Sequence, residues 1–248
     1  MTRKIVLLMI VLAVGAGALA VSIMTQPEEQ SNANAEADTV LAKGQEQDQD
    51  QEQVVSSETG FLNYDIIIGD KDAPVEIIEY AAISCSHCAD FHEDVYPELK
   101  KKYLDTGKAK LVYRNFIFNN PFDVFAASIS RCVPEEKFLS TLETYFQYQN
   151  VWNNLPELRR ILEEDGKENA LKYAQDEVIK IGKLAGVSEA QAAKCFDNEA
   201  VTKYLFKIRQ EAVVKYEVES TPTLIVNGKK LDNNDMASLV KAIESGLK

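Results

Sequence analysis

The sequence predicts an α/β fold for the part of the chain that follows residue 60. Three observations support this class. A strand, a helix and a second strand follow one another between residues 72 and 118, residues 121–216 have helical patterns, and two short strands and a helix come last. Consecutive strands joined by a helix lie parallel, with a right-handed crossover. We therefore expect a β-α-β unit, a helical region and a β-β-α unit, in that order.

The β-α-β unit begins with the run "DAPVEIIEYAA" at residues 72–82, which is apolar enough to form a central strand. A helix should follow Cys85, because large apolar side chains recur there at four-residue spacing: Phe91, Val95, Leu99 and Tyr103. The run "KAKLVYRNFIF" at residues 108–118 predicts the second strand.

Several helix starts are visible between residues 121 and 216. Proline followed by glutamate marks two of them, at Pro134 and Pro156, because proline and acidic side chains are favoured in the first helical turn. Ser188 and Gln191 have the spacing of a capping box, in which each side chain bonds to the other residue's backbone.

The last unit contains the run "TPTLIVNGKKL" at residues 221–231. It predicts two short strands around Asn227 and Gly228, because an Asn-Gly pair is strongly favoured in two-residue hairpin turns. The final helix is expected over residues 235–245.

The N-terminal region predicts export. Residues 1–25 begin with Arg3 and Lys4 and continue with an uncharged apolar run from Ile5 to Met24. This pattern is typical of a signal peptide, for which Ala18-Leu19-Ala20 offers a cleavage site, or of an uncleaved membrane anchor. Either alternative places the remainder of the chain in the periplasm, free or anchored to the inner membrane. Disulfides persist in that compartment.

Charge and composition separate this region from the folded part. The formal net charge of the chain is -12, which argues against a nucleic-acid partner because few cations would neutralise phosphates. Residues 26–60 are rich in Gln, Glu, Asp and Ser and lack aromatic residues. Such a segment cannot bury enough apolar surface to fold. We expect it to be a disordered acidic linker.

Cys85 and Cys88 form a Cys-x-x-Cys pair, which has three possible interpretations. A metal site would use these thiols with His87 and His92, but the four side chains are close together in the sequence; copper is the metal that such soft ligands suit best. A structural disulfide that closes so small a loop constrains the unfolded chain little. A redox pair is favoured, because Cys85 lies where a strand ends and a helix begins. Backbone N–H groups and the helix dipole there stabilise a thiolate.

The same residues resemble a known family. The Cys-Ser-His-Cys sequence, the helix "ADFHEDVYPELK" and the Thr-Pro in "STPTLIVNG" about 130 residues later are similar to the DsbA-type thiol:disulfide oxidoreductases. The resemblance covers residues 61–248 and implies a thioredoxin fold with a helical domain inserted at about residues 121–216. It implies no cofactor and no resident metal.

The resemblance assigns roles within the redox pair. Cys85 corresponds to the exposed nucleophile and Cys88 to its buried partner. Ser86 and His87 correspond to the dipeptide that tunes the reduction potential. Ser86 stands where proline is common in the family, so the potential of those relatives cannot be transferred to this chain.

Further residues correspond to the surroundings of the pair. Pro222 resembles the cis-proline that faces the active disulfide, and Thr221 before it would pair with an extended substrate strand. Glu79 resembles a buried acid that relays protons to Cys88. A carboxylate in water at position 79 and an ordinary trans proline at position 222 are the alternatives. His92 is expected to be a solvated helix residue.

Cys132 and Cys195 lie 63 positions apart near the ends of two expected helices. An even number of cysteines in an exported chain suggests a second, structural disulfide, and some relatives of this type resemble the chain in this respect. Two separate buried thiols are the alternative.

The expected activity is the transfer of a disulfide to reduced, unfolded exported proteins. The resemblance implies reoxidation by a DsbB-like membrane partner, near which a membrane tether could hold the enzyme. A disulfide isomerase or reductase is the first alternative, although residues 26–60 lack the apolar heptads of an oligomerisation segment. A copper-binding module is the second.

Overall fold

A computed structural model of the chain describes residues 60–248. The expectations for residues 1–25 and for the linker that precedes residue 60 lie outside the described residues. Within residues 60–248, no helix combines the length and the apolar character needed to cross a membrane.

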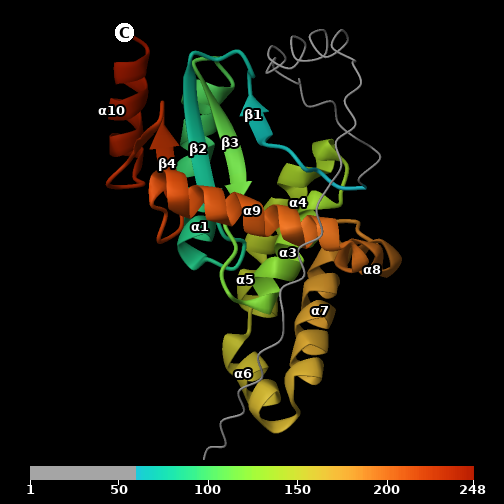
Figure 1. Ribbon diagram of the computed structural model, residues 1–248. Coiled ribbons are helices and arrows are strands. Elements are labelled where there is room, and N and C mark those ends of the chain that lie inside the picture. The colour runs from blue at the N-terminus through green and yellow to red at the C-terminus, as the bar shows by residue number, and fades with distance from the viewer. Residues whose placement is uncertain (1–59) are drawn as a thin grey trace, which may run out of the picture. The chain divides into compact units, whose positions relative to one another are not determined.

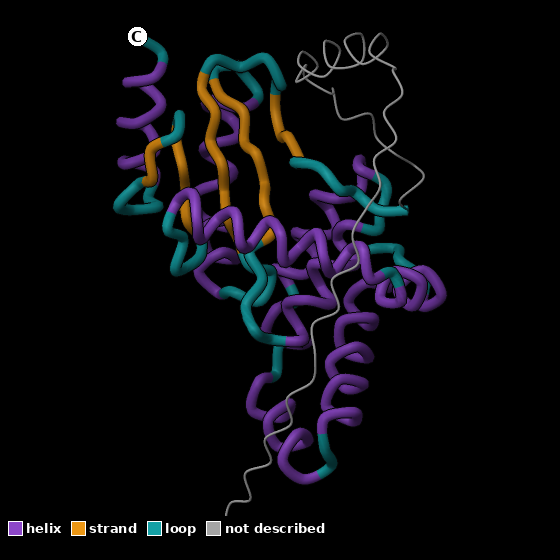
Figure 2. Tube along the Cα trace, in the orientation of Figure 1, coloured by secondary structure: helices purple, strands orange, loops and turns teal. Residues whose placement is uncertain are grey.

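A five-stranded mixed sheet forms one end of this region (Figures 1 and 2). Its strands are β1 (Ile66–Gly69), β2 (Val75–Ala81), β3 (Ala109–Asn115), β4 (Thr223–Val226) and β5 (Lys229–Lys230), in the order β1-β3-β2-β4-β5. Strands β2 and β3 are parallel, with Glu79 opposite Tyr113, and all other pairs are antiparallel. The predicted parallel pair and the central place of β2 are therefore confirmed.

The crossover between β2 and β3 is one helical stretch in four segments: α1 (Ser86–Asp90), the π-helical η1 (Phe91–Val95), α2 (Tyr96–Leu99) and the π-helical η2 (Lys100–Leu104). Helices α3 (Pro121–Arg131), α4 (Glu135–Gln147), α5 (Gln149–Trp152), α6 (Leu155–Glu164), α7 (Lys167–Leu184), α8 (Glu189–Asp197) and α9 (Glu199–Tyr216) lie between β3 and β4, and α10 (Met236–Gly246) ends the chain. The helical region is present where the sequence predicts it. The capping box of Ser188 and Gln191 at the start of α8 is also confirmed.

Alternation along the strands gives the sheet two covered faces. Ile77, Leu111 and Leu224 pack with the crossover helix and α10. The next residues along these strands, Ile78, Val112 and Ile225, face the other way. They pack with α9, which crosses that face in Figure 1. Because both faces are buried, five of the seven residues of β2 are apolar; Glu76 and Glu79 are the exceptions.

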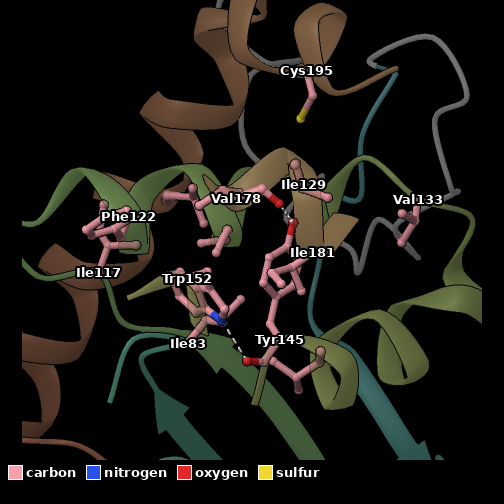
Figure 3. Packing of buried hydrophobic residues seen from close by; sticks show 14 of the residues in the cluster. Ile83, Ile117, Phe122, Ile129, Val133, Tyr145, Trp152, Val178, Ile181 and Cys195 are labelled. Atoms are coloured by element: carbon pink, nitrogen blue, oxygen red, sulfur yellow. Dashed lines mark hydrogen bonds between the residues drawn. The ribbon is translucent and has the colours of Figure 1, made fainter. Parts of the chain in front are cut away.

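The largest core cluster joins the helical region to residues of β1, β2 and β3 and to Cys88 of α1. Figure 3 shows its centre, where the indole N–H of Trp152 donates to the carbonyl of Tyr145 at 2.9 Å. The hydroxyl of Tyr145 donates to the carbonyl of Val178, also at 2.9 Å. Helices α4, α5 and α7 are thus fixed to one another within the core cluster that also contains Cys88.

Strand β1 was not predicted. Its apolar run is only three isoleucines long and ends at Gly69, which is too short to distinguish a strand from a loop. The strand is an edge that pairs with β3 alone. Asp65 anchors it by accepting two hydrogen bonds from the guanidinium of Arg114, at 2.7 and 2.6 Å.

Candidate active site

Cys85 and Cys88 lie where β2 passes into α1. Both are free thiols in the structure; Cys85 is partly exposed, and Cys88 is completely buried. Cys85 is the N-cap residue of α1, with extended backbone angles, and its carbonyl accepts from the N–H groups of Cys88 and Ala89. One sulfur is therefore accessible to other thiols and the other is not.

The environment of Cys85 favours the thiolate. A hydrogen bond from the Cys88 thiol makes the largest contribution and burial opposes it. The side chain of Thr221 and then the backbone N–H groups of Cys88 and His87 add to the effect of Cys88; together these causes lower the pKa of Cys85 from 9.0 to about 5. The sequence pointed to the backbone N–H groups at the helix start, but it did not indicate that the partner thiol would contribute most. With a pKa of about 5, the thiol of Cys85 is ionised at neutral pH.

Cys88 behaves in the opposite way. Burial, followed by the hydrogen bond and the negative charge of Cys85 and then by the charge of Glu79, raises its pKa well above 9.0. The reduced pair therefore holds one proton, on the buried sulfur.

Thr221 and Pro222 face this pair from the other end of the chain. The Sγ of Cys85 lies 3.3 Å from the carbonyl oxygen of Thr221, to which the thiol donates when it is protonated. The Thr221–Pro222 peptide bond is cis. Ser86 and His87 are exposed on the first turn of α1. The structure thus brings together Cys85, Cys88 and the Thr-Pro pair, across 136 residues of sequence.

Glu79 is completely buried, so a carboxylate in water at this position is excluded. The Nε2 atom of His92 lies 3.1 Å from both of its carboxylate oxygens. The expectation that His92 is solvated is wrong, because this residue is only 8% exposed. The structure therefore places a buried imidazole against a buried carboxylate whose charge acts on Cys88.

A π-helical turn explains why His92 points inward. Pro97 lacks the N–H that would bond to the carbonyl of Glu93, and the N–H of Tyr96 bonds instead to the carbonyl of Phe91, five residues back. The wider turn brings Phe91 and His92 to the buried side together. A pattern of four-residue spacing cannot show this change of phase.

Within residues 60–248, no group of three or more His, Cys, Asp and Glu side chains is placed so that it could hold a metal ion. His92, one of the four ligands considered for such a site, is hydrogen-bonded to Glu79 instead.

This combination of a central β2, a Cys-x-x-Cys pair at the start of a helix and a cis-proline facing it agrees with the comparison to known families. A family model described as thioredoxin matches residues 62–245. The chain belongs to the thioredoxin family.

One relative is a bacterial protein that matches three quarters of this chain. A Rickettsia typhi protein assigned to the protein-disulfide oxidoreductases is 28% identical to this thioredoxin-family chain over 185 residues, which cover 75% of the chain and 63% of that protein. The chain thus spans less than two thirds of the length of that relative.

Two solved structures are similar as well. They are a protein-disulfide isomerase from Novosphingobium aromaticivorans, with a TM-score of 0.65 and 24% identity over 74% of this chain and 97% of that one, and alpha-DsbA1 of Wolbachia pipientis, with a TM-score of 0.60 and 23% identity over 74% and 90%. At this identity they show the fold alone. They confirm the predicted thioredoxin fold with additional helices, and the Rickettsia relative supports the resemblance to the thiol:disulfide oxidoreductases.

Other residues of this thioredoxin-family site have no signal in the sequence. The side-chain amide of Gln149 donates to the carbonyls of Ile83 and Cys85, at 2.7 and 3.0 Å, and that of Asn153 donates to the carbonyl of Ser84 at 2.9 Å. Helix α5 and the residue after it thus hold three successive carbonyls of the loop that leads into the redox pair.

Asp123 holds the same loop from α3. Its carboxylate accepts from the N–H groups of Ser84, at 3.1 Å, and Phe118, at 2.8 Å. Burial raises the pKa of Asp123 from 3.8 to about 6, although the hydrogen bonds from Phe118 and Ser84 act in the other direction.

This shift predicts a pH dependence of stability. A carboxyl group whose pKa is higher in the folded state binds its proton more tightly there, so its contribution is complete below about pH 4 and is lost as the pH rises through 6. We expect the loss to be at most about 3 kcal/mol. Urea unfolding of wild type and Asp123→Asn between pH 4 and 7 should show a difference in unfolding free energy that changes in this window. A difference that is independent of pH would contradict the shift.

The second cysteine pair forms a disulfide. Cys132, the C-cap residue of α3, is bonded to Cys195 of α8, with Cα atoms 6.0 Å apart. Cys195 is buried in the largest core cluster and is labelled in Figure 3.

Proposed function

We propose that this chain is a thiol:disulfide oxidoreductase that introduces disulfides into reduced exported proteins. The asymmetry of the Cys85–Cys88 pair is the observation that supports this function best. The exposed sulfur has a pKa lowered to about 5 by the Cys88 thiol and backbone N–H groups, and the buried sulfur has a pKa raised by burial. A stable thiolate at position 85 favours the reduced form of the pair, which makes the oxidised form a good disulfide donor.

The reaction proceeds in two exchanges. A client thiolate attacks the Sγ of Cys85 in the oxidised pair, the Cys85–Cys88 bond breaks, and Cys88 leaves and takes up a proton. A second client thiolate then attacks the client sulfur of the mixed disulfide and expels Cys85 as a thiolate. Two client thiols are oxidised to one disulfide, and the pair gains the two electrons.

The neighbouring residues have supporting roles in this proposal. The backbone of Thr221 binds the client in an extended conformation beside Pro222, which the short distance between Cys85 and Thr221 supports. Ser86 and His87 tune the potential from the exposed first turn. Glu79 supplies a buried proton acceptor near Cys88.

The patterns of residues 1–25 and 26–60 support a place of action in the periplasm, either free or tethered to the inner membrane. Reoxidation by a DsbB-like membrane partner would complete the cycle. A spacer between an anchor and the folded region would let the pair reach both client and partner.

Two ribonuclease substrates test the function. The oxidised protein should remove thiols from reduced, unfolded ribonuclease in proportion to the amount of protein added. It should restore the activity of scrambled ribonuclease only slowly. Activity with the scrambled substrate alone would identify an isomerase, and no loss of thiols in either assay would contradict the proposal.

A further inference from the structure

Reduction of the Cys85–Cys88 pair requires a route for a proton into the protein. Cys88 is completely buried, and its thiol has no direct access to water. Each time Cys88 leaves as a thiolate it must gain a proton, and each time it attacks during reoxidation it must lose one. The carboxylate of Glu79 is buried on the adjacent strand and is equally inaccessible.

His92 links this carboxylate with the surface. Its Nε2 atom contacts both oxygens of Glu79, and its Nδ1 atom is buried without a hydrogen-bond partner in the structure. Buried polar atoms of side chains are normally satisfied, so an unpaired ring nitrogen points to a function. Aromatic rings surround the imidazole, with centroid distances of 4.8 Å to Phe146, 5.1 Å to Tyr96 and 6.2 Å to Tyr113.

His92 is also one of the residues that line a cavity of about 540 Å³. Besides His92, its walls include Ser86 from the exposed turn of the redox pair and the side chain of Gln149. Three acidic side chains also line it: Asp90, Glu93 and Glu143. No lysine or arginine lines it. Because a cavity of this size admits several water molecules, it can supply and accept protons next to the imidazole.

We propose that His92 and Glu79 form a proton relay between the cavity beside Ser86 and the buried Cys88 sulfur. When a thiolate breaks the Cys85–Cys88 bond, the Nε2 proton passes through the Glu79 carboxylate to Cys88. Nδ1 takes a replacement proton from water in the cavity. The net change is one S–H bond formed and one proton taken from solvent.

Reoxidation runs the same route outward. The Cys88 proton passes to Glu79 and on to Nε2 when Cys88 attacks a mixed disulfide at Cys85, and Nδ1 releases a proton to the cavity. One catalytic cycle therefore returns the imidazole to its starting state. His92 acts on Cys88 only through Glu79 and is in this sense a positioning residue. This inference rests on the proposed redox function of the pair.

Single-turnover reduction of the oxidised full-length protein by dithiothreitol tests the relay. His92→Gln keeps an N–H that can donate to Glu79 but cannot take up a proton at a second atom. We expect this variant to be slower by about tenfold or more, because proton transfer by a positioned group contributes at least that much. Glu98→Gln, which removes an exposed carboxyl of α2 that does not line this cavity, is the matched control and should react at the wild-type rate.

Two readouts separate proton transfer from a structural effect. His92→Ala opens space beside the cavity, and added imidazole should restore its rate, whereas sodium chloride at the same ionic strength should not. The pH midpoint for alkylation of reduced Cys85 by iodoacetamide should be unchanged in both His92 variants. A wild-type rate in His92→Gln would overturn the relay, as would a slow His92→Ala that imidazole does not restore. Dithiothreitol replaces the client in this experiment, so its outcome is independent of the ribonuclease assay. The relay can fail while the ribonuclease assay succeeds, and the relay can hold while the ribonuclease assay fails.

Discussion

Replacement of either Cys85 or Cys88 by serine should abolish disulfide transfer to reduced ribonuclease, whereas only Cys88→Ser, which keeps the partly exposed sulfur, should form a mixed disulfide with a client that carries an activated disulfide. Cys85 is the partly exposed sulfur, and its Sγ lies beside the Thr221 carbonyl, where a client would bind. Without it, the buried Cys88 cannot reach a client thiol. Without Cys88, a bond between Cys85 and a client cannot be resolved from within the protein.

The two serine variants control for each other, because each removes one sulfur from the same turn and leaves a hydroxyl of similar size. Non-reducing gel electrophoresis after mixing with a client that carries an activated disulfide should show a covalent adduct for Cys88→Ser and none for Cys85→Ser. Adducts formed by Cys85→Ser through Cys88 would refute the assignment of the two roles.

Removal of the Cys132–Cys195 disulfide should lower the free energy of unfolding more than the titration of Asp123 does. The bond closes a loop with a sequence separation of 63 and joins α3 to α8. In the chain-entropy account, opening a loop of this length stabilises the unfolded state by about 4 kcal/mol. Because Cys195 is buried in the core cluster that underlies the redox pair, its replacement also removes some packing.

Urea unfolding of Cys132→Ala/Cys195→Ala measures this loss, which should appear as a lower midpoint. The double variant Cys85→Ser/Cys88→Ser is the matched control, since it removes two cysteines but keeps the structural bond, and its midpoint should stay close to that of the wild type. If both double variants unfolded at the wild-type midpoint, the bond would have no structural role.

The parts of the fold that the sequence predicts correctly are those set by local chemistry. The Asn227-Gly228 turn forms where two positive backbone φ angles are needed, 46° and 78°, which these two residue types tolerate. The capping box at Ser188 requires only residues three positions apart. Strand β2 is recognisable because burial on both faces makes five of its seven residues apolar.

The parts that could not be predicted depend on contacts that are distant in the sequence. Gln149 lies 66 residues from the carbonyl of Ile83 that it binds, and nothing in the residues around it indicates this partner. The Asp123 carboxylate is one acidic side chain among many until the loop at Ser84 is placed against it. The prediction that His92 is solvated is wrong because a π-helical turn changes the face of the helix on which this residue lies.

The reduction potential of the Cys85–Cys88 pair, measured against glutathione between pH 6 and 8, tests the central claim that Cys85 is a thiolate. The Cys88 thiol and the backbone N–H groups lower the pKa of Cys85 to about 5. Reduction should therefore bind one proton, on Cys88, so the potential should change by about 30 mV per pH unit and lie well above the -300 mV or so of structural disulfides. A change of about 59 mV per pH unit, which corresponds to two protons, or a potential near that of a structural disulfide, would contradict it.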